Sequence, residues 1–178
     1  MKKLLIVVDY QNDFVDGALG CAQALKIEEK LAEKIKEYRA MGENGQIIFT
    51  MDTHGEDYLD TQEGKHLPVP HCIKGTKGWQ LYGRIGELRE EGDLSFDKPT
   101  FGSWELGEYL RGHKDSFESI EFAGVVTNIC VISNIAIAKA ALPEAPIIVD
   151  AGCVASNDDD LQKAALDVMG SVHVEVKR

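Results

Sequence analysis

The feature that most constrains the fold of this chain is a regular alternation of strand-like and helix-like segments. Short apolar runs rich in β-branched residues predict strands over residues 3–8, 46–51, 93–97, 119–125, 145–149 and 172–176. Segments with apolar residues at helical spacing predict helices over residues 23–41, 79–91, 105–111, 129–141 and 157–169. Strands that alternate with helices build a mostly parallel sheet covered by helices on both faces. The sequence therefore predicts an α/β fold, a doubly wound three-layer sandwich with a six-stranded sheet.

Polar side chains follow four of these predicted strands at or soon after the point where each strand ends. Asp9 follows the first strand and Asp52 the second, while Lys98 follows the third. Cys130 lies a few residues after the fourth. Because the carboxyl ends of parallel strands meet at one edge of a sheet, we expect these side chains to share an active site there. The alternatives are that Asp9 caps a turn and that Lys98 is an ordinary surface lysine.

Cys130 is a candidate nucleophile because it lies in the first turn of a predicted helix. Thr127 or Asn128, just before it, can cap such a helix. The positive end of the helix dipole and the free backbone N–H groups favour a thiolate at this position. The same N–H groups could hold an oxyanion next to the sulfur. The alternative is a structural cysteine packed under the helix, which is the commoner role of a free cysteine.

Asp52, His54 and His71 form a candidate set of metal ligands. One carboxylate and two imidazoles suit Zn, Fe or Mn and leave positions open for water or substrate. Because Asp52 and His54 are alternate residues at a strand end, they converge only if the chain bends or bulges there. Glu63, in a polar loop over residues 55–69, is a further candidate ligand. The alternative is that the histidines are solvated loop residues.

The net charge limits the kinds of molecule that this chain can bind, and the spacing of its cysteines indicates its cellular compartment. The formal net charge of -11 at pH 7 argues against nucleic acid and anionic membrane surfaces. No apolar run approaches the ~20 residues of a membrane-spanning helix, and the run over residues 4–8 is too short for a signal peptide. Four widely spaced cysteines favour free thiols and a cytoplasmic location. With 178 residues, 44% of them hydrophobic, we expect one globular domain over residues 1–178.

Four segments together resemble the nicotinamidase/isochorismatase-like cysteine hydrolases. They are Asp9-x-Gln11-x-Asp13-Phe14, Asp52-x-His54, Lys98, and Gly124-Val125-Val126-Thr127-Asn128-Ile129-Cys130-Val131. The resemblance implies an isochorismatase-like, Rossmann-like fold and a triad of Asp9, Lys98 and Cys130. It also implies a cis peptide bond between Val125 and Val126, with the N–H groups of Val126 and Cys130 directed at an oxyanion. Members of this superfamily are often dimers or tetramers, so the resemblance implies a homo-oligomer.

Asp52-x-His54 together with His71-Cys72 resembles the nicotinamidase branch of that superfamily. Its metal is held by Asp, His and His, and some members add a Glu that matches Glu63. The resemblance implies a divalent metal, Zn before Fe or Mn, and an amidase that releases ammonia from nicotinamide or a similar aromatic amide. Nicotinamidases usually have an aromatic residue just before the Pro that precedes the second metal His, whereas residues 67–71 read Leu-Pro-Val-Pro-His. We predict that Phe14 and Trp104 supply apolar pocket walls instead.

Two other functions stay open on the sequence alone. One is a related hydrolase acting on another small amide, such as an N-carbamoyl compound or ureidoacrylate, or on isochorismate. The other is a degenerate member that serves as a binding or assembly module. In the hydrolase hypotheses Asp9 takes the thiol proton of Cys130, Lys98 stabilises the thiolate, and the thiolate attacks the carbonyl to give a thioester.

Overall fold

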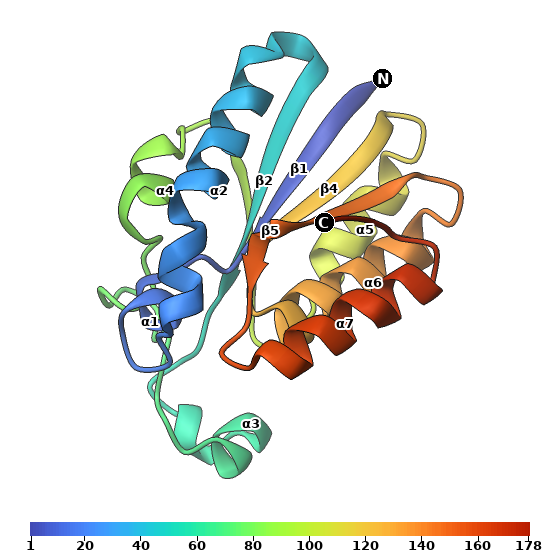
Figure 1. Ribbon diagram of the computed structural model, residues 1–178. Coiled ribbons are helices and arrows are strands. Elements are labelled where there is room, and N and C mark those ends of the chain that lie inside the picture. Colours follow the sequence, from blue (N-terminus) through green and yellow to red (C-terminus); the bar gives the residue numbers. More distant parts are fainter.

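The computed structural model describes all 178 residues and contains one six-stranded sheet, in which every neighbouring pair of strands is parallel. The strand order is β3-β2-β1-β4-β5-β6 (Figure 1). The strands are β1 (Lys2–Val8), β2 (Gly45–Asp52), β3 (Leu94–Lys98), β4 (Phe117–Val125), β5 (Ile147–Ala155) and β6 (Glu175–Lys177). The predicted six-stranded α/β fold is therefore confirmed, with a sheet that is parallel throughout rather than mostly parallel.

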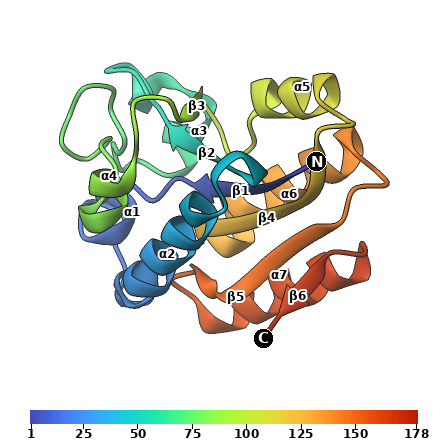
Figure 2. The same ribbon diagram turned by 90° about the horizontal axis from the view of Figure 1, so that it is seen from above.

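Helices cover both faces of the sheet and give the predicted three layers (Figure 2). One face packs against α2 (Ala22–Ala40), with α1 (Asn12–Val15) and α4 (Gly83–Leu88) beside it. The other face packs against α5 (Trp104–Gly112), α6 (Ile132–Ala141) and α7 (Asp159–Ser171). None of these helices combines the length and the apolar character needed to cross a bilayer.

β1 lies at the centre of the sheet and contributes to both cores. Residues 4–8 are fully buried because helices cover both faces of the strand. Leu4, Ile6 and Val8 belong to the core under α5, α6 and α7, while Leu5 and Val7 belong to the core under α2. This two-sided burial explains why the strand is a continuous aliphatic run rather than an alternating one.

The crevice for a functional site opens between β1 and β4. The chain leads from β1 to β2 and β3 on one side and from β4 to β5 and β6 on the other, so the strand order reverses between these two neighbours. Gly124 has a φ of +114°, and a Cβ there would lie 2.1 Å from the carbonyl oxygen of Val8. A glycine is therefore required where the two central strands meet at their carboxyl ends.

The structure differs from the sequence predictions in two connecting segments. The predicted helix over residues 79–91 is reduced to α4, because Tyr82 N–H donates to the carbonyl oxygen of Tyr10 and Gly83 adopts a φ of +44°. The predicted loop over residues 55–69 instead contains two short helices, η2 (Tyr58–Asp60) and α3 (Gln62–His66). The hydroxyl of Thr61 caps α3 by accepting from Gly64 N–H at 3.0 Å. These helices extend beyond the carboxyl edge of the sheet (Figure 1).

Candidate active site

Asp9 and Lys98 form a fully buried ion pair at the carboxyl edge of the sheet. Lys98 Nζ lies 2.5 Å from Asp9 Oδ2, and the hydroxyl of Thr50 donates to Asp9 Oδ1 at 2.7 Å. Asp9 directly follows β1, whereas Lys98 is the last residue of β3. Because β2 lies between these strands, the Lys98 side chain reaches across the end of β2 to meet Asp9. The parallel sheet thus joins two residues that the sequence separates widely.

Cys130 lies against this ion pair, with its Sγ 3.5 Å from Lys98 Nζ and only 3% of the residue exposed. It belongs to a π-helical turn over Thr127–Val131 that leads into α6. Such turns are rare and occur frequently at functional sites. The peptide bond between Val125 and Val126, just before this turn, is cis. The structure therefore brings Asp9, Lys98 and Cys130 together at one point.

The start of this helix differs from the sequence prediction. Val126 is the N-cap residue, and no side chain caps the turn, so the capping role predicted for Thr127 or Asn128 is wrong. Asn128 Oδ1 instead accepts a hydrogen bond from the hydroxyl of Ser156 at 2.6 Å. Asn134 donates to the carbonyl oxygen of Cys130 at 2.8 Å. Side chains from outside the turn over Thr127–Val131 therefore hold the segment around Cys130 in place.

Burial and the Asp9 carboxylate both oppose ionisation of the Cys130 thiol. Complete burial raises the pKa of the Cys130 thiol well above its ordinary value, and the Asp9 carboxylate raises it further while Lys98 opposes both. Burial also raises the pKa of Asp9, against the lowering effect of Lys98. Burial disfavours the Lys98 ammonium, yet the attraction of Asp9, Cys130 and Asp52 raises its pKa overall. The raised pKa of Cys130 opposes the effect expected from the helix dipole, so the thiol needs a base, for which Asp9 is in place.

Asp52, His54 and His71 converge into a compact buried cluster. The Nε2 atoms of His54 and His71 lie 3.0 Å and 3.3 Å from Asp52 Oδ2, and the three candidate ligand atoms lie within 4.8 Å of one another. His71 Nδ1 lies 2.8 Å from the carbonyl oxygen of Val69. Donation of a proton there leaves the lone pair on Nε2, as metal-binding histidines require. The donor set therefore fits a divalent metal.

The chain brings Asp52 and His54 together by leaving the sheet between them. Asp52 ends β2, and Thr53 N–H then donates to the carbonyl oxygen of Lys98. His54 turns to pair with another segment, since its N–H donates to the carbonyl oxygen of Cys72 at 3.0 Å. This pairing sets His54 beside His71.

Glu63 and His66 both lie on α3 but have different surroundings. Glu63 Oε1 lies 3.8 Å from His54 Nε2 and 3.6 Å from His71 Nε2. His66 is exposed, and its Nδ1 lies 2.9 Å from the carbonyl oxygen of Gln62. Glu63 thus completes a group of four candidate ligands, whereas His66 is a surface residue.

Gln11 and Asp13 support the metal cluster, a role that the sequence reasoning did not assign to them. The buried amide of Gln11 donates to the carbonyl oxygen of Asp52 at 2.8 Å and accepts from its N–H at 2.7 Å. Asp13 Oδ2 accepts from Cys72 N–H at 2.8 Å, next to His71. The loop after β1 therefore provides Asp9, the candidate base, and two side chains that hold the metal cluster in place. The Asp-x-Gln-x-Asp spacing in the sequence could have indicated these roles.

One cavity of about 350 Å³ is lined by Cys130 and by members of the metal cluster. Its polar wall includes Asp52, Glu63, His71 and Cys130. Its apolar wall includes Phe14, Leu19, Leu67, Phe101, Val126 and Ile129. A small cavity that is apolar apart from a few convergent polar groups is typical of a binding site for a small molecule.

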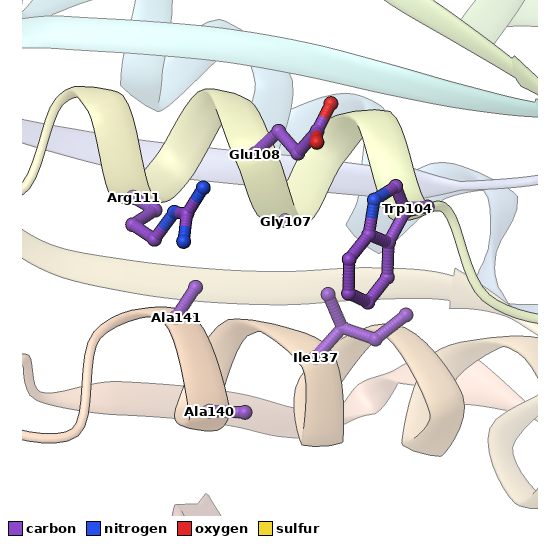
Figure 3. Close-up of a pocket in the computed structure, with 7 residues that line it drawn as sticks. All are labelled: Trp104, Gly107, Glu108, Arg111, Ile137, Ala140 and Ala141. Carbon is purple, nitrogen blue, oxygen red and sulfur yellow. The ribbon is translucent and has the colours of Figure 1, made fainter.

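Trp104 does not line this cavity, so the pocket role predicted for it is wrong. Its residue is 70% exposed, and its ring lies in a separate groove between α5 and α6 (Figure 3). The reason is the cap of α5, where Ser103 accepts from Leu106 N–H at 3.1 Å and turns the chain away from the cavity. Phe101, three residues earlier, lines the cavity instead.

Comparisons with known proteins agree with this geometry. The family described as Isochorismatase domain matches residues 3–176. An isochorismatase family protein, PncA of Bacillus subtilis, is 35% identical over 74% of this chain and 75% of its own length. The crystal structure of nicotinamidase PncA from Bacillus subtilis matches with a TM-score of 0.85 and 28% identity over 100% of both chains. That of pyrazinamidase from Pyrococcus horikoshii in complex with zinc matches with a TM-score of 0.84 and 25% identity, over 100% of this chain and 99% of its own.

Proposed function

The chain belongs to the isochorismatase family, and from this premise we propose that it is a metal-containing cysteine amidohydrolase. The substrate is nicotinamide or a similar small aromatic amide, and the products are ammonia and the carboxylic acid. The observation that carries the proposal is the single cavity that contains both Cys130 and the Asp52 and His71 side chains. The likeness to a nicotinamidase and to a pyrazinamidase supports an amide as the substrate.

In this proposal Cys130 is the nucleophile and Asp9 is the general acid and base. Asp9 accepts the thiol proton, and the sulfur attacks the amide carbonyl, while Lys98 at 3.5 Å stabilises the developing thiolate. The backbone N–H groups of Val126 and Cys130 hold the tetrahedral oxyanion. The C–N bond then breaks as Asp9 returns its proton to the leaving ammonia, and a thioester remains. Water, deprotonated by Asp9, hydrolyses the thioester and restores the thiol.

Asp52, His54 and His71 would hold the divalent metal, with Glu63 as a fourth ligand. A neighbour solved in complex with zinc supports zinc, and the donor set also suits iron or manganese. When bound, the metal supplies a Lewis acid that orients a ring nitrogen of the substrate. Gln11 and Lys98 both contact Asp52, and Lys98 also lies 3.5 Å from Cys130 Sγ, so Lys98 links this ligand to the proposed nucleophile.

The apolar wall favours a flat ring, since Phe14 and Phe101 line the cavity that leads to Cys130. Leu67 lines the same cavity, in the segment where nicotinamidases usually carry an aromatic residue. This difference supports a second candidate, a related amidase acting on an N-carbamoyl compound or ureidoacrylate. Isochorismate hydrolysis needs no such metal cluster, and the assembled triad argues against a binding module without activity.

Ammonia release from nicotinamide by the purified protein tests the proposal directly. The assay compares untreated enzyme, enzyme stripped with a chelator, and stripped enzyme restored with zinc, iron or manganese. Activity that disappears on stripping, returns with metal and is absent in Cys130→Ala is the expected result. A folded, metal-loaded enzyme that releases no ammonia from nicotinamide but hydrolyses an N-carbamoyl substrate would favour the second candidate. Inactivity on all these substrates would contradict both.

We further propose that residues 1–178 act as one hydrolase domain in the cytoplasm, without a nucleic acid or membrane partner. All four cysteines are free, which suits a reducing compartment. The strongly acidic composition, with a formal net charge of -11, opposes binding to anionic polymers and surfaces. Fractionation of cells with an antibody to the chain would test the location.

A further inference from the structure

Tyr58 is the one large buried side chain in the segment over residues 55–70, which carries η2 and α3 beyond the carboxyl edge of the sheet (Figure 1). Tyr58 is 1% exposed, and the only other buried residue of the segment is Gly64. Most of the remaining residues are exposed. Since Glu63 and Leu67 belong to this segment and line the cavity, their positions depend on a part of the chain with only one buried side chain.

The ring of Tyr58 packs against both candidate metal-binding imidazoles. Its centroid lies 4.7 Å from that of His54 and 5.0 Å from that of His71, and both contacts are edge-to-face. The two imidazoles also meet each other edge to face, with their centroids 4.9 Å apart. Three buried rings that contact one another in pairs have little freedom to rotate, because side chains in a packed interior interdigitate with few voids. The tyrosine ring therefore limits the orientations of both histidines.

The hydroxyl of Tyr58 begins a chain of hydrogen bonds that ends on His71. It donates to the carbonyl oxygen of Leu67 at 2.9 Å, and that oxygen also accepts from Val69 N–H at 2.7 Å. The carbonyl oxygen of Val69 in turn lies 2.8 Å from His71 Nδ1. The prolines on either side of Val69 have no N–H, so Val69 supplies the one backbone donor between Leu67 and His71. By holding the Leu67 carbonyl, Tyr58 thus helps to fix the peptide group that orients His71.

The backbone of Tyr58 holds the other end of α3. Its carbonyl oxygen accepts from the N–H and from the hydroxyl of Thr61, at 3.0 Å and 2.6 Å. A Cβ at Gly64 would lie 2.0 Å from the same oxygen, so α3 packs directly on it only because that position is glycine. Tyr58 therefore contacts α3 at its start through its carbonyl oxygen and just past its end through its hydroxyl. Glu63 lies between these two points, so Tyr58 also positions the fourth candidate ligand.

We propose that Tyr58 is a positioning residue that couples metal binding to the shape of the substrate cavity. Its ring holds the metal-binding imidazoles, and its hydroxyl holds the Leu67 wall of the cavity. This role rests on the proposed function, because it takes the Asp52 cluster as the metal site and the cavity as the substrate site. Metal binding then orders the segment over residues 55–70, and loss of order in this segment weakens metal binding, since such coupling is reciprocal.

Zinc affinity of Tyr58→Phe tests the contribution of the hydroxyl alone, because this variant keeps the ring. We expect the affinity, measured by competition with a chromophoric chelator, to fall by about 3–10-fold, somewhat less than for loss of a direct partner of a ligand. Tyr38→Phe is the matched control, since Tyr38 is also buried and its hydroxyl donates to Glu121 at 2.9 Å under α2. Equal zinc affinities of Tyr58→Phe and Tyr38→Phe would overturn the proposal.

Trypsin cleavage after Lys65 measures the order of the segment without reference to activity. Lys65 is exposed on α3, and we expect zinc to slow its cleavage in the wild type by about fivefold or more, because cleavage requires local opening. Tyr58→Phe should be cleaved faster than the wild type with zinc present, and Tyr58→Leu, which also removes the ring, faster still. Thermal melting checks that each variant is folded. A cleavage rate in the wild type that zinc does not change would contradict the coupling.

Kinetics with nicotinamide separates failure of this role from failure of the proposed function. At saturating zinc, Tyr58→Phe is expected to raise KM by about 3–5-fold and to leave kcat within about twofold of the wild type, because the hydroxyl acts on the cavity wall and not on the reacting atoms. A fall in kcat with an unchanged KM would contradict the positioning role. A wild type inactive on every amide would refute the proposed function, and zinc affinity and Lys65 cleavage would still decide the role of Tyr58.

Discussion

Two buried clusters of charge, each centred on a lysine, lie at different places on the same sheet. At the carboxyl edge, Lys98 contacts Asp9 and Asp52 and is fully buried. Under α2, Lys34 contacts Glu121 at 2.6 Å and Asp150 at 2.9 Å, with 11% of its side chain exposed. Both lysines have a raised pKa, since the attraction of their carboxylate neighbours outweighs the opposing effect of burial.

The difference between the clusters is what surrounds the ion pairs. Glu121 accepts hydrogen bonds from Lys34 and from the hydroxyl of Tyr38 at 2.9 Å. The Lys98 cluster adjoins Cys130, which lines a cavity of about 350 Å³. A buried ion pair alone is therefore a poor sign of function, because it serves structure as readily as chemistry. The two clusters differ in the cavity, which is lined by Asp52 and Cys130 but by no residue of the Lys34 cluster.

Replacing the cysteine beside each cluster is expected to give the largest difference in kcat between the clusters. Cys130→Ala is expected to reduce kcat by about 10³-fold or more, since no other group can form the thioester. Cys153, which is also buried and whose pKa burial raises to about 12, adjoins Asp150 in the second cluster. Cys153→Ala is therefore the matched control and should keep nearly full turnover. Steady-state ammonia release by both proteins checks this, and equal activities would contradict the assignment.

Lysine substitution should separate activity from stability. Lys98→Met is expected to lower kcat by about 10²-fold or more, because the thiolate loses its only cationic neighbour within reach. Lys34→Met should leave kcat almost unchanged but lower the free energy of unfolding by about 3 kcal/mol, because the buried Glu121 loses its closer cation and keeps only Lys177 at 3.9 Å. Urea titration and kinetics on both variants measure the two effects. A loss of activity in Lys34→Met with normal stability would show that the second cluster also serves the reaction.

Removal of the Gln11 amide should weaken metal binding by about tenfold, the usual effect of losing a group that orients a ligand. Gln11→Ala leaves the N–H and carbonyl groups of Asp52 without their side-chain partner. Gln46→Ala is the control, since Gln46 bonds the Tyr109 hydroxyl at the opposite edge of the sheet. Competition with a chromophoric chelator measures the affinity without reference to activity. An unchanged metal affinity in Gln11→Ala would mean that the loop after β1 positions Asp9 but does not position the metal ligand Asp52.

The smallest expected effect concerns the cavity wall. Leu67→Phe adds an aromatic ring to the cavity and is expected to lower KM for nicotinamide by a factor of about 3–10, as for one added aromatic contact. Leu59→Phe is the control, because Leu59 is 52% exposed and lies outside the cavity wall. The same measurement with an N-carbamoyl substrate separates the two candidate substrates. A rise in KM for nicotinamide would contradict the proposal that an aromatic ring binds in this cavity.

The sequence predicted the sheet and the convergence of four polar residues because both follow from strand order alone. Because the carboxyl ends of parallel strands share one edge, the residues that follow them lie close together whatever the conformation of the loops. These residues are Asp9, Asp52, Lys98 and Cys130. Their state of protonation was not predictable, because burial of Cys130 depends on the complete tertiary packing.

The remaining errors concern segments whose structure depends on distant contacts. Trp104 was misplaced because its direction is set by the cap at Ser103, whose N–H bonds Asn134 on another helix. The helix expected from residue 79 was shortened by a hydrogen bond to Tyr10, far away in the sequence. Gln11 lies within the Asp-x-Gln-x-Asp motif, but its pairing with Asp52 forms only when β1 and β2 are side by side.

The central position of β1 leaves this strand incompletely paired while the chain is being synthesised. Within this sheet β1 is synthesised before the other strands, yet Lys3 pairs with Ser119 of β4, which is made much later. Until then a fully aliphatic strand has only one of its two neighbours, and such segments readily associate with other chains. Cys130 lies five residues after the end of β4, so the segment that gives β1 its second neighbour also supplies the thiol of the proposed nucleophile. A nascent chain arrested before β4 would therefore be inactive and prone to aggregation at the same time.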